Sequence, residues 1–320
     1  MTNISINIIG LGTETYPGGK ATLQILTSSK GVSKETIICK VDKVLADLSV
    51  QLDSDCTVQF LDGKSKDGHN VLLHSTAHLM AQAVKRLYPK TKVTIGPFLE
   101  NRFYYDFDVV TPFTEEDLLK IEEEMLKISK ENIDIIHEEK SRAEALKFFK
   151  NIGEDYKIEI INDLDDSEVL KVYAQGDFTD LCRGPHVQST GMIQHFKLLS
   201  SSAAYWRGDE NNQTLQRVYG TSFTSAKDLK KYLLMLEEQK KRDHRKIGKE
   251  LDLYFHDEEV GPGLPLWTPN GAVIIDELEA LAKEKEDLGG YKRVRTPHLT
   301  KGALYENSGH LEHYMSSMYP

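Results

Sequence analysis

The chain has 320 residues and a composition ordinary for a globular protein, 39% hydrophobic and 28% charged. No apolar run approaches the roughly 18 residues of a transmembrane helix, and the first ten residues lack the basic start of a signal peptide. Three cysteines are too few for a disulfide framework, so we expect a cytoplasmic protein. The net charge of −10 argues weakly against a nucleic-acid partner, but basic residues gather between Lys230 and Lys249 and could bind phosphates or form a solvated helix face.

The first sixty residues predict a small α+β unit. The segments Ala21–Ser28 and Cys56–Gly63 have the pattern of short strands, and the second ends in an Asp-Gly turn. Between them, Lys40–Ser49 predicts a short helix or a mixture of strand and helix. The polar stretch Lys64–Asn70 then predicts a linker.

A second α+β unit follows this linker. Helical periodicity covers Val71–Tyr88, and Pro89 ends the helix because proline cannot continue it. The other predicted elements, in chain order, are a strand at Asn101–Val109, a helix capped at Thr114, a helix within Glu139–Asn151, and strands within Lys171–Gly184, Phe196–Trp206 and Gln213–Phe223.

A long helix from about Ser225 to Glu250 is predicted to lead into a third unit. There, Ala272–Gly290 predicts an amphipathic helix closed by glycine, and Tyr291–Leu299 predicts a strand interrupted by Pro297. The fold class is therefore α+β. The predicted parts are residues 1–63, 64–224, 225–250 and 251–320.

Two pairs of chemically active residues have i, i+4 spacing. His74 and His78 lie in the first helix of the second unit and should share one helix face. Cys182 and His186 are also four apart, with Asp180 just before them. A zinc protease would carry glutamate after the first histidine, but serine occupies that position, so its general base is missing.

Three imidazoles and one thiol favour either a zinc site or a hydrolytic cluster whose imidazoles exchange protons near pH 7. The two pairs lie far apart in the sequence, so the sequence alone does not show that they meet in the fold. Two ordinary helix-face histidines and a small buried cysteine explain the same residues without any chemistry.

A third cluster combines aromatic and charged residues. Trp206, Arg207 and Asp209 in a turn, followed by Arg217 and Tyr219, could bind a nucleotide by stacking and phosphate contact. An Arg207–Asp209 pair that only rigidifies the turn is the alternative. The sequence contains no Walker loop and no Rossmann glycine fingerprint.

Five segments occur in the order and at the intervals of bacterial-type threonyl-tRNA synthetases, which the chain resembles. The resemblance is specific from His74 onward and weaker in the first 60 residues. The segments are His74–Pro89, Thr94–Asp108, Cys182–Val187, Ala204–Gly220 and Lys241–Tyr254.

The resemblance implies a module for each part of the chain. Residues 1–63 would form a TGS module, which is a small β-grasp domain, and residues 64–224 an editing domain similar to that of alanyl-tRNA synthetase. Residues 225–250 would form a linker helix. Residues 251–320 would begin a class II antiparallel-sheet catalytic domain, in which Trp267–Leu299 resembles motif 1, the dimer interface of that class.

The arginine-bearing motifs that bind ATP, and the ligands of the family's catalytic zinc, do not occur in this sequence. By resemblance, ATP, Mg²⁺, one catalytic Zn²⁺, threonine attachment and homodimerisation belong to a full-length enzyme. This chain would show only hydrolytic editing of seryl-tRNA(Thr). Its implied partner is tRNA(Thr), and no membrane is expected.

Editing is needed because one methyl group changes binding by only about 1–3 kcal/mol, so a site for threonine also admits serine. We expect His74 and His186 to place or deprotonate the attacking water, His78 and Cys182 to shape the pocket, and Asp180 to hold the seryl ammonium or hydroxyl. Contacts with the substrate end or the tRNA are implied for Tyr105, Lys157, Arg183, Trp206 and Arg207.

Three alternatives stay open at this point. Cys182 could be a nucleophile that forms an acyl-enzyme. Zinc could bind His74, His78, Cys182 and His186, although the resemblance implies editing without a required metal, which we favour. The chain could also be a non-catalytic RNA-binding module or a free-standing trans-editing protein.

Overall fold

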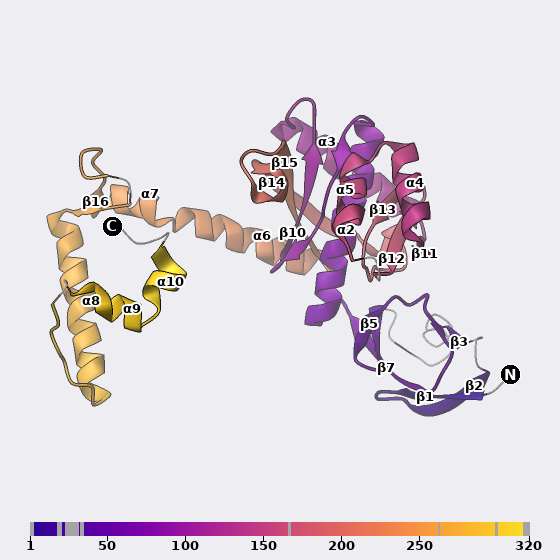
Figure 1. Ribbon diagram of the computed structural model, residues 1–320, viewed down its shortest axis with the longest axis horizontal. Helices are drawn as coiled ribbons and strands as arrows, with labels where there is room; N and C mark the ends of the chain where they lie inside the picture. Colours follow the sequence, from indigo (N-terminus) through magenta and orange to yellow (C-terminus); the bar gives the residue numbers. More distant parts are fainter. Residues whose placement is uncertain are drawn as a thin grey trace. The chain divides into compact units, whose positions relative to one another are not determined.

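The computed structural model describes residues 3–17, 21–22, 32, 35–165, 168–261, 263–297 and 300–315. The chain divides into two compact units, Met1–Met235 and Leu236–Pro320. Helices alternate with several small sheets (Figure 1), so the predicted α+β class is confirmed at this level. Among the described residues, no helix is both long and apolar enough to cross a membrane.

The described residues between Asn3 and Asp62 are built around a five-stranded sheet with the order β2–β1–β7–β4–β5. β1 and β7 are parallel neighbours, whereas the other pairs are antiparallel. Ile6, Ile8 and Val58 are buried because alternate side chains of these strands face one apolar core. The strands are β1 (Asn3–Ile8), β2 (Gly12–Pro17), β4 (Thr36–Val41), β5 (Val44–Ala46) and β7 (Cys56–Asp62), beside a small pair, β3 (Ala21–Thr22) and β6 (Gln51–Leu52).

Of the short helix or strand–helix mixture predicted for Lys40–Ser49, only the strand is found. β4 and β5 form a hairpin whose two turn residues, Asp42 and Lys43, have φ of 46° and 75°. Two-residue hairpins favour turns with positive φ at both positions, so turn chemistry prevails over helical periodicity here. The strand predicted at Ala21–Ser28 lies outside the described residues except for β3.

Helix α2 (Lys66–Leu87) is the central helix of the next part of this unit. It starts earlier than the predicted Val71, because the Ser65 side chain accepts the backbone N–H of Gly68 and caps it. The stretch predicted as a linker is therefore mostly its first turns. The helix ends where predicted, and nearly every side chain from Val71 to Val84 is buried.

Two antiparallel sheets accompany α2. One has the order β14–β15–β10–β8, with β9 also beside β10, and the other has the order β11–β12–β13. The predicted helices and strands of this part are confirmed, but helix α5 and strands β8, β9 and β11 were not predicted. The elements are β8 (Lys92–Val93), β9 (Phe98–Leu99), β10 (Arg102–Asp108), α3 (Glu115–Glu131), β11 (Ile135–Lys140), α4 (Arg142–Ile152), α5 (Asp155–Asp163), β12 (Leu170–Gln175), β13 (Phe178–Leu181), β14 (His195–Tyr205) and β15 (Thr214–Phe223), with single 3₁₀ turns at Thr190–Met192 and Trp206–Gly208.

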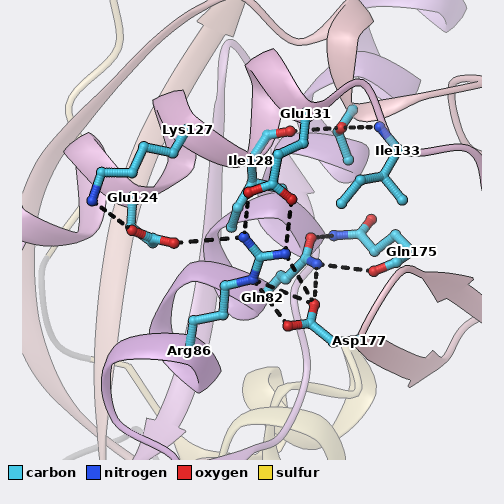
Figure 2. Close-up of polar contacts among 10 residues, drawn as sticks. Gln82, Arg86, Glu124, Lys127, Ile128, Glu131, Ile133, Gln175 and Asp177 are labelled. Atoms are coloured by element: carbon cyan, nitrogen blue, oxygen red, sulfur yellow. Dashed lines mark hydrogen bonds and ion pairs between the residues drawn. The ribbon is translucent and has the colours of Figure 1, made fainter.

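A polar network fixes the β12–β13 hairpin against α2 (Figure 2). Arg86 donates hydrogen bonds to Glu131 of α3 and to Asp177 in the hairpin turn. Deeper in, the Gln175 side chain donates to the backbone carbonyl of His78 at 3.2 Å. These contacts set the position of β13, and of the residues that follow it, along α2.

The long helix predicted up to Glu250 is in fact two helices, α6 (Ala226–Lys241) and α7 (His244–Glu250). The break lies at Asp243, whose side chain accepts the backbone N–H of Arg245. Aspartate is poor inside a helix and good as an N-cap, which explains the interruption.

The second unit contains one long helix, α8 (Pro269–Leu288), which begins after its N-cap Thr268 and confirms the predicted helix. The strand predicted at Tyr291–Leu299 is not found. Residues 291–297 pair with no described strand, and residues 298–299 are outside the described part. The remaining elements are β16 (Tyr254–Phe255), β17 (Leu266–Trp267), α9 (Gly302–Asn307) and α10 (His310–Tyr314).

Candidate active site

The fold brings the two i, i+4 pairs together. His74 and His78 project from α2, and Cys182 and His186 lie on the segment after β13. One donor atom from each of the four lies within 4.8 Å of the other three. The His74 and His186 rings are stacked with centroids 4.6 Å apart, and the His78 and His186 centroids are 4.3 Å apart. The cluster therefore combines residues that are local in sequence with a contact that spans more than a hundred positions.

Hydrogen bonds define which nitrogen of His74 faces the thiol. His74 Nδ1 lies 3.1 Å from the carbonyl oxygen of Gly96, which can only accept, so Nδ1 carries the proton. The unprotonated Nε2 then faces Cys182 Sγ at 2.9 Å and accepts the thiol proton. A Cβ at position 96 would lie 2.2 Å from the Tyr105 ring, so glycine is needed for this carbonyl to approach.

His186 is held from the opposite side by Ser75. The Ser75 hydroxyl lies 3.1 Å from His186 Nδ1 and accepts the backbone N–H of Val187. The Ser75 hydroxyl then donates its proton to His186 Nδ1. In that arrangement His186 Nε2 carries the ring proton, which points to Cys182 Sγ at 3.3 Å. Serine in place of a protease glutamate thus supports the ring of a neighbouring histidine.

Burial keeps this cluster uncharged. Desolvation lowers the pKa of His74 and lowers the pKa values of His78 and His186 well below their ordinary range. Desolvation also raises the pKa of Cys182 to about 12. At neutral pH the site therefore holds neutral imidazoles and a thiol, and a thiol is a far weaker nucleophile than a thiolate.

The buried histidines should make the fold sensitive to acid. Unfolded histidines bind protons near pH 6.5, whereas these rings bind them only at lower pH, so the unfolded state binds more protons in between. The free energy of unfolding should therefore hold above about pH 7 and fall as the pH drops below about 6.5. Urea unfolding from pH 8 to 5 measures this.

Two variants separate the buried histidines from general acid effects in that titration. His78→Gln should make the fall in the free energy of unfolding below about pH 6.5 shallower, because the unfolded chain loses one histidine that takes up a proton. His244→Gln, whose side chain is 83% exposed, should leave that fall unchanged. If both variants show the same pH dependence of the free energy of unfolding below about pH 6.5, the explanation is contradicted.

A cavity of about 710 Å³ opens against one side of the cluster. His74, His78 and Cys182 line it, whereas His186 is 1% exposed and does not. Arg183 lies in the lining and pairs with Glu168. Apolar walls come from Ile95, Pro97, Phe98, Ile160, Leu164 and Val169. The cavity thus has one chemically active end and mostly apolar sides.

Asp180 and Lys157 form a buried ion pair in the same cavity. Each side chain is 2% exposed, and the Lys157 ammonium contacts the Asp180 carboxylate and donates to the carbonyl of Thr94. The Tyr105 hydroxyl donates to Asp180 Oδ2 at 2.6 Å and accepts from Lys157 at 3.2 Å. His78 Nε2 lies 3.8 Å from the same carboxylate. Tyr105 is fully buried and lies outside the lining, so it reaches the cavity only through Asp180 and Lys157.

Trp206 and Arg207 do not line this cavity. Trp206 is buried against Tyr156, and its indole N–H donates to Glu159 of α5. Arg207 pairs with Asp163, also on α5, rather than with Asp209. Both residues therefore hold α5, the helix that carries Lys157.

Sequence reasoning missed three residues that support the cluster, namely Ser75, Gly96 and Asp47. Asp47, which directly follows strand β5 of the N-terminal sheet, accepts a hydrogen bond from the backbone N–H of His186 at 2.8 Å. Ser75 has a sequence signal, because it occupies the position at which a catalytic glutamate was sought. Gly96 and Asp47 have none, since their roles arise from contacts distant in sequence.

Comparison with known proteins places this site in a family context. Residues 170–219 match the model of the threonyl and alanyl tRNA synthetase second additional domain. The chain is 50% identical to the threonine–tRNA ligase of Anoxybacillus flavithermus over 95% of its own length and 48% of the relative's. The corresponding enzyme of Pelobacter propionicus is 47% identical over the whole chain and 50% of the relative, and that of Maridesulfovibrio salexigens is 51% identical over 91% and 45%. The chain spans about half the length of these curated relatives.

Proposed function

We propose that this chain, a homologue of threonine–tRNA ligases along nearly all of its length, is part of such an enzyme and hydrolyses seryl-tRNA(Thr) in the cavity beside His74. The observation that carries the proposal is the cavity itself: neutral imidazoles, a thiol and a buried Lys157–Asp180 pair converge at one end of it. The substrate would be the aminoacyl ester on the terminal adenosine of the tRNA.

The proposed reaction needs a base for the attacking water and donors for the carbonyl oxygen. His74 is neutral at physiological pH and lines the cavity, so its Nε2 can accept a proton from water when the thiol proton turns away. His186, which we expected to share this task, lies behind Cys182 and would instead hold the thiol through its own Nε2–H.

The ion pair is suited to the polar groups of the substrate. The Asp180 carboxylate would accept from the seryl ammonium or hydroxyl, and the Lys157 ammonium would donate to the developing oxyanion. In this proposal serine is preferred because the fixed Asp180 and Lys157 side chains would exclude an additional methyl group. Discrimination by exclusion is the second step of a double sieve.

Zinc fits the donor set of the cluster. His74, His78, His186 and Cys182 supply three nitrogens and a sulfur, with Gly96 and Ser75 fixing two of the rings from behind. Zinc held by all four residues would stabilise the fold, whereas zinc held by three of them, with one position open, would lower the pKa of a bound water molecule. We nevertheless propose that editing requires no metal, because neutral His74 already provides a base.

The layout of the whole enzyme belongs to the same proposal. Residues 1–63 would be the TGS β-grasp module, 64–224 the editing domain, 225–250 the linker and 251–320 the start of the class II catalytic domain. Threonine, ATP, Mg²⁺, a catalytic Zn²⁺ and dimerisation through motif 1 would belong to the full-length cytoplasmic synthetase, with tRNA(Thr) as the shared partner.

Release of amino acid from seryl-tRNA(Thr) and threonyl-tRNA(Thr) tests the proposal directly. The chain should release serine at least about 10-fold faster than threonine, consistent with the one-methyl difference. A zinc chelator should leave the rate of serine release unchanged. No release from either substrate, together with unfolding on chelation, would favour a zinc-stabilised RNA-binding module instead.

A further inference from the structure

The Asp47 side chain connects the N-terminal sheet to the segment that carries Cys182 and His186. Asp47 follows β5 and is 8% exposed, and the next residue, Leu48, is buried in the core of that sheet. Both carboxylate oxygens accept hydrogen bonds across the boundary between the N-terminal sheet and the part of the unit built around α2. Oδ1 accepts the backbone N–H of His186 at 2.8 Å, and Oδ2 accepts the hydroxyl of Tyr173 at 2.7 Å.

Tyr173 transmits the second of these contacts to the same segment. Its ring packs against His186 with centroids 4.5 Å apart. A Cβ at Gly184 would lie 1.9 Å from the Tyr173 hydroxyl oxygen, so the ring and the Gly184 backbone are in close contact. The Gly184 N–H in turn donates to Cys182 Sγ at 3.2 Å. One carboxylate therefore fixes the segment at His186 directly and near Cys182 through an aromatic ring.

Asp47 is well placed to hold this segment without touching substrate. It is not among the residues that line the cavity, and His186 lies between it and Cys182. The His137 ring, 3.4 Å from Oδ2, is its third neighbour across the boundary. Charge-assisted hydrogen bonds of this kind are shorter and stronger than neutral ones, so they can define the position of a short segment.

We infer that Asp47 is a positioning residue that makes the N-terminal sheet part of the editing site. Its carboxylate holds Cys182–His186 so that the thiol faces His74 Nε2 and the ring of His186 stays against Ser75. The inference deepens the proposed hydrolytic function and rests on it for its catalytic consequence. The positional consequence stands independently of that function.

Variants of Asp47 in the full chain test the inference with two readouts. The first is kcat and KM for serine release, and the second is the rate at which iodoacetamide alkylates Cys182, resolved from Cys39 and Cys56 by peptide mass spectrometry. Asp47→Ala should lower kcat about 10- to 100-fold, since small misplacements cost this much. KM should change little, and Cys182 alkylation should become several-fold faster.

The conservative variant separates position from charge. Asp47→Asn can still accept from the His186 N–H and can donate to the Tyr173 oxygen, so it should retain most of kcat and the slow alkylation. Tyr173→Phe removes one of the two contacts and should fall between Asp47→Asn and Asp47→Ala. This variant also keeps the test open if Asp47→Ala does not fold.

Val58→Ala is the matched control, because Val58 is fully buried in the N-terminal sheet but does not contact the segment. It should lower stability while leaving kcat and Cys182 alkylation unchanged. If Asp47→Ala matches Val58→Ala in both readouts, the inference is overturned. If wild-type chain releases no serine but Asp47→Ala still exposes Cys182, the proposed function fails and the positioning role of Asp47 is supported.

Discussion

His74→Ala is expected to slow serine release from seryl-tRNA(Thr) by about 100-fold or more, because a positioned general base contributes roughly that much. His74 is the one histidine of the cluster whose Nε2 is unprotonated, whose Nδ1 proton is fixed by Gly96, and whose ring lines the cavity. Its lowered pKa leaves it neutral at pH 7. Single-turnover release of serine at saturating enzyme isolates this step from binding.

Cys182→Ser distinguishes the two routes in the same assay. If water attacks directly, the variant should keep most of the activity, because its hydroxyl can still donate to His74. If Cys182 is the nucleophile, the variant should be nearly inactive. The pKa of Cys182, about 12, adds a second distinction: a thiolate route should accelerate from pH 7 to 9, whereas neutral His74 gives a flat profile. Retention of full activity by His74→Ala would contradict the role of His74.

The i, i+4 pairs could be predicted from the sequence, but their meeting could not. The periodicity of α2 places His74 and His78 on one face through local hydrogen bonds alone. The position of Cys182 opposite them depends on where β13 lies along α2. That position follows from the Arg86–Asp177 contact and from the bond between Gln175 and the His78 carbonyl, which join residues about a hundred positions apart.

The errors in the sequence-based prediction have local physical causes. Lys40–Ser49 has apolar residues at a helical spacing, yet positive φ at Asp42 and Lys43 produces a hairpin. That hairpin brings Asp47 to His186, a contact that no spacing could indicate. The nucleotide contact of Trp206 and Arg207 stays a prediction; in the structure the two side chains pair with Glu159 and Asp163 of α5.

Lys157→Met is expected to lower the free energy of unfolding by about 3–5 kcal/mol, because removing one partner leaves a buried charge uncompensated. Asp180 would keep only the Tyr105 hydroxyl and the distant His78 ring as polar neighbours near Oδ2. Lys92→Met is the matched control. Lys92 pairs with Asp155, which lies on the same helix as Lys157, but both side chains of this pair are exposed. The variant should therefore lower the free energy of unfolding by only about 0–1 kcal/mol. Urea unfolding followed by circular dichroism measures both.

The double variant Lys157→Met/Asp180→Leu separates stability from catalysis. It removes both buried charges, so it should recover much of the stability lost in the single variant. Serine release should stay low, because neither the ammonium of the substrate nor its oxyanion would find a partner. A double variant that unfolds as easily as Lys157→Met would contradict the uncompensated charge as the cause. One that regains both stability and serine release would contradict the assignment of this pair to the substrate, since a merely structural ion pair is the kind that apolar side chains can replace.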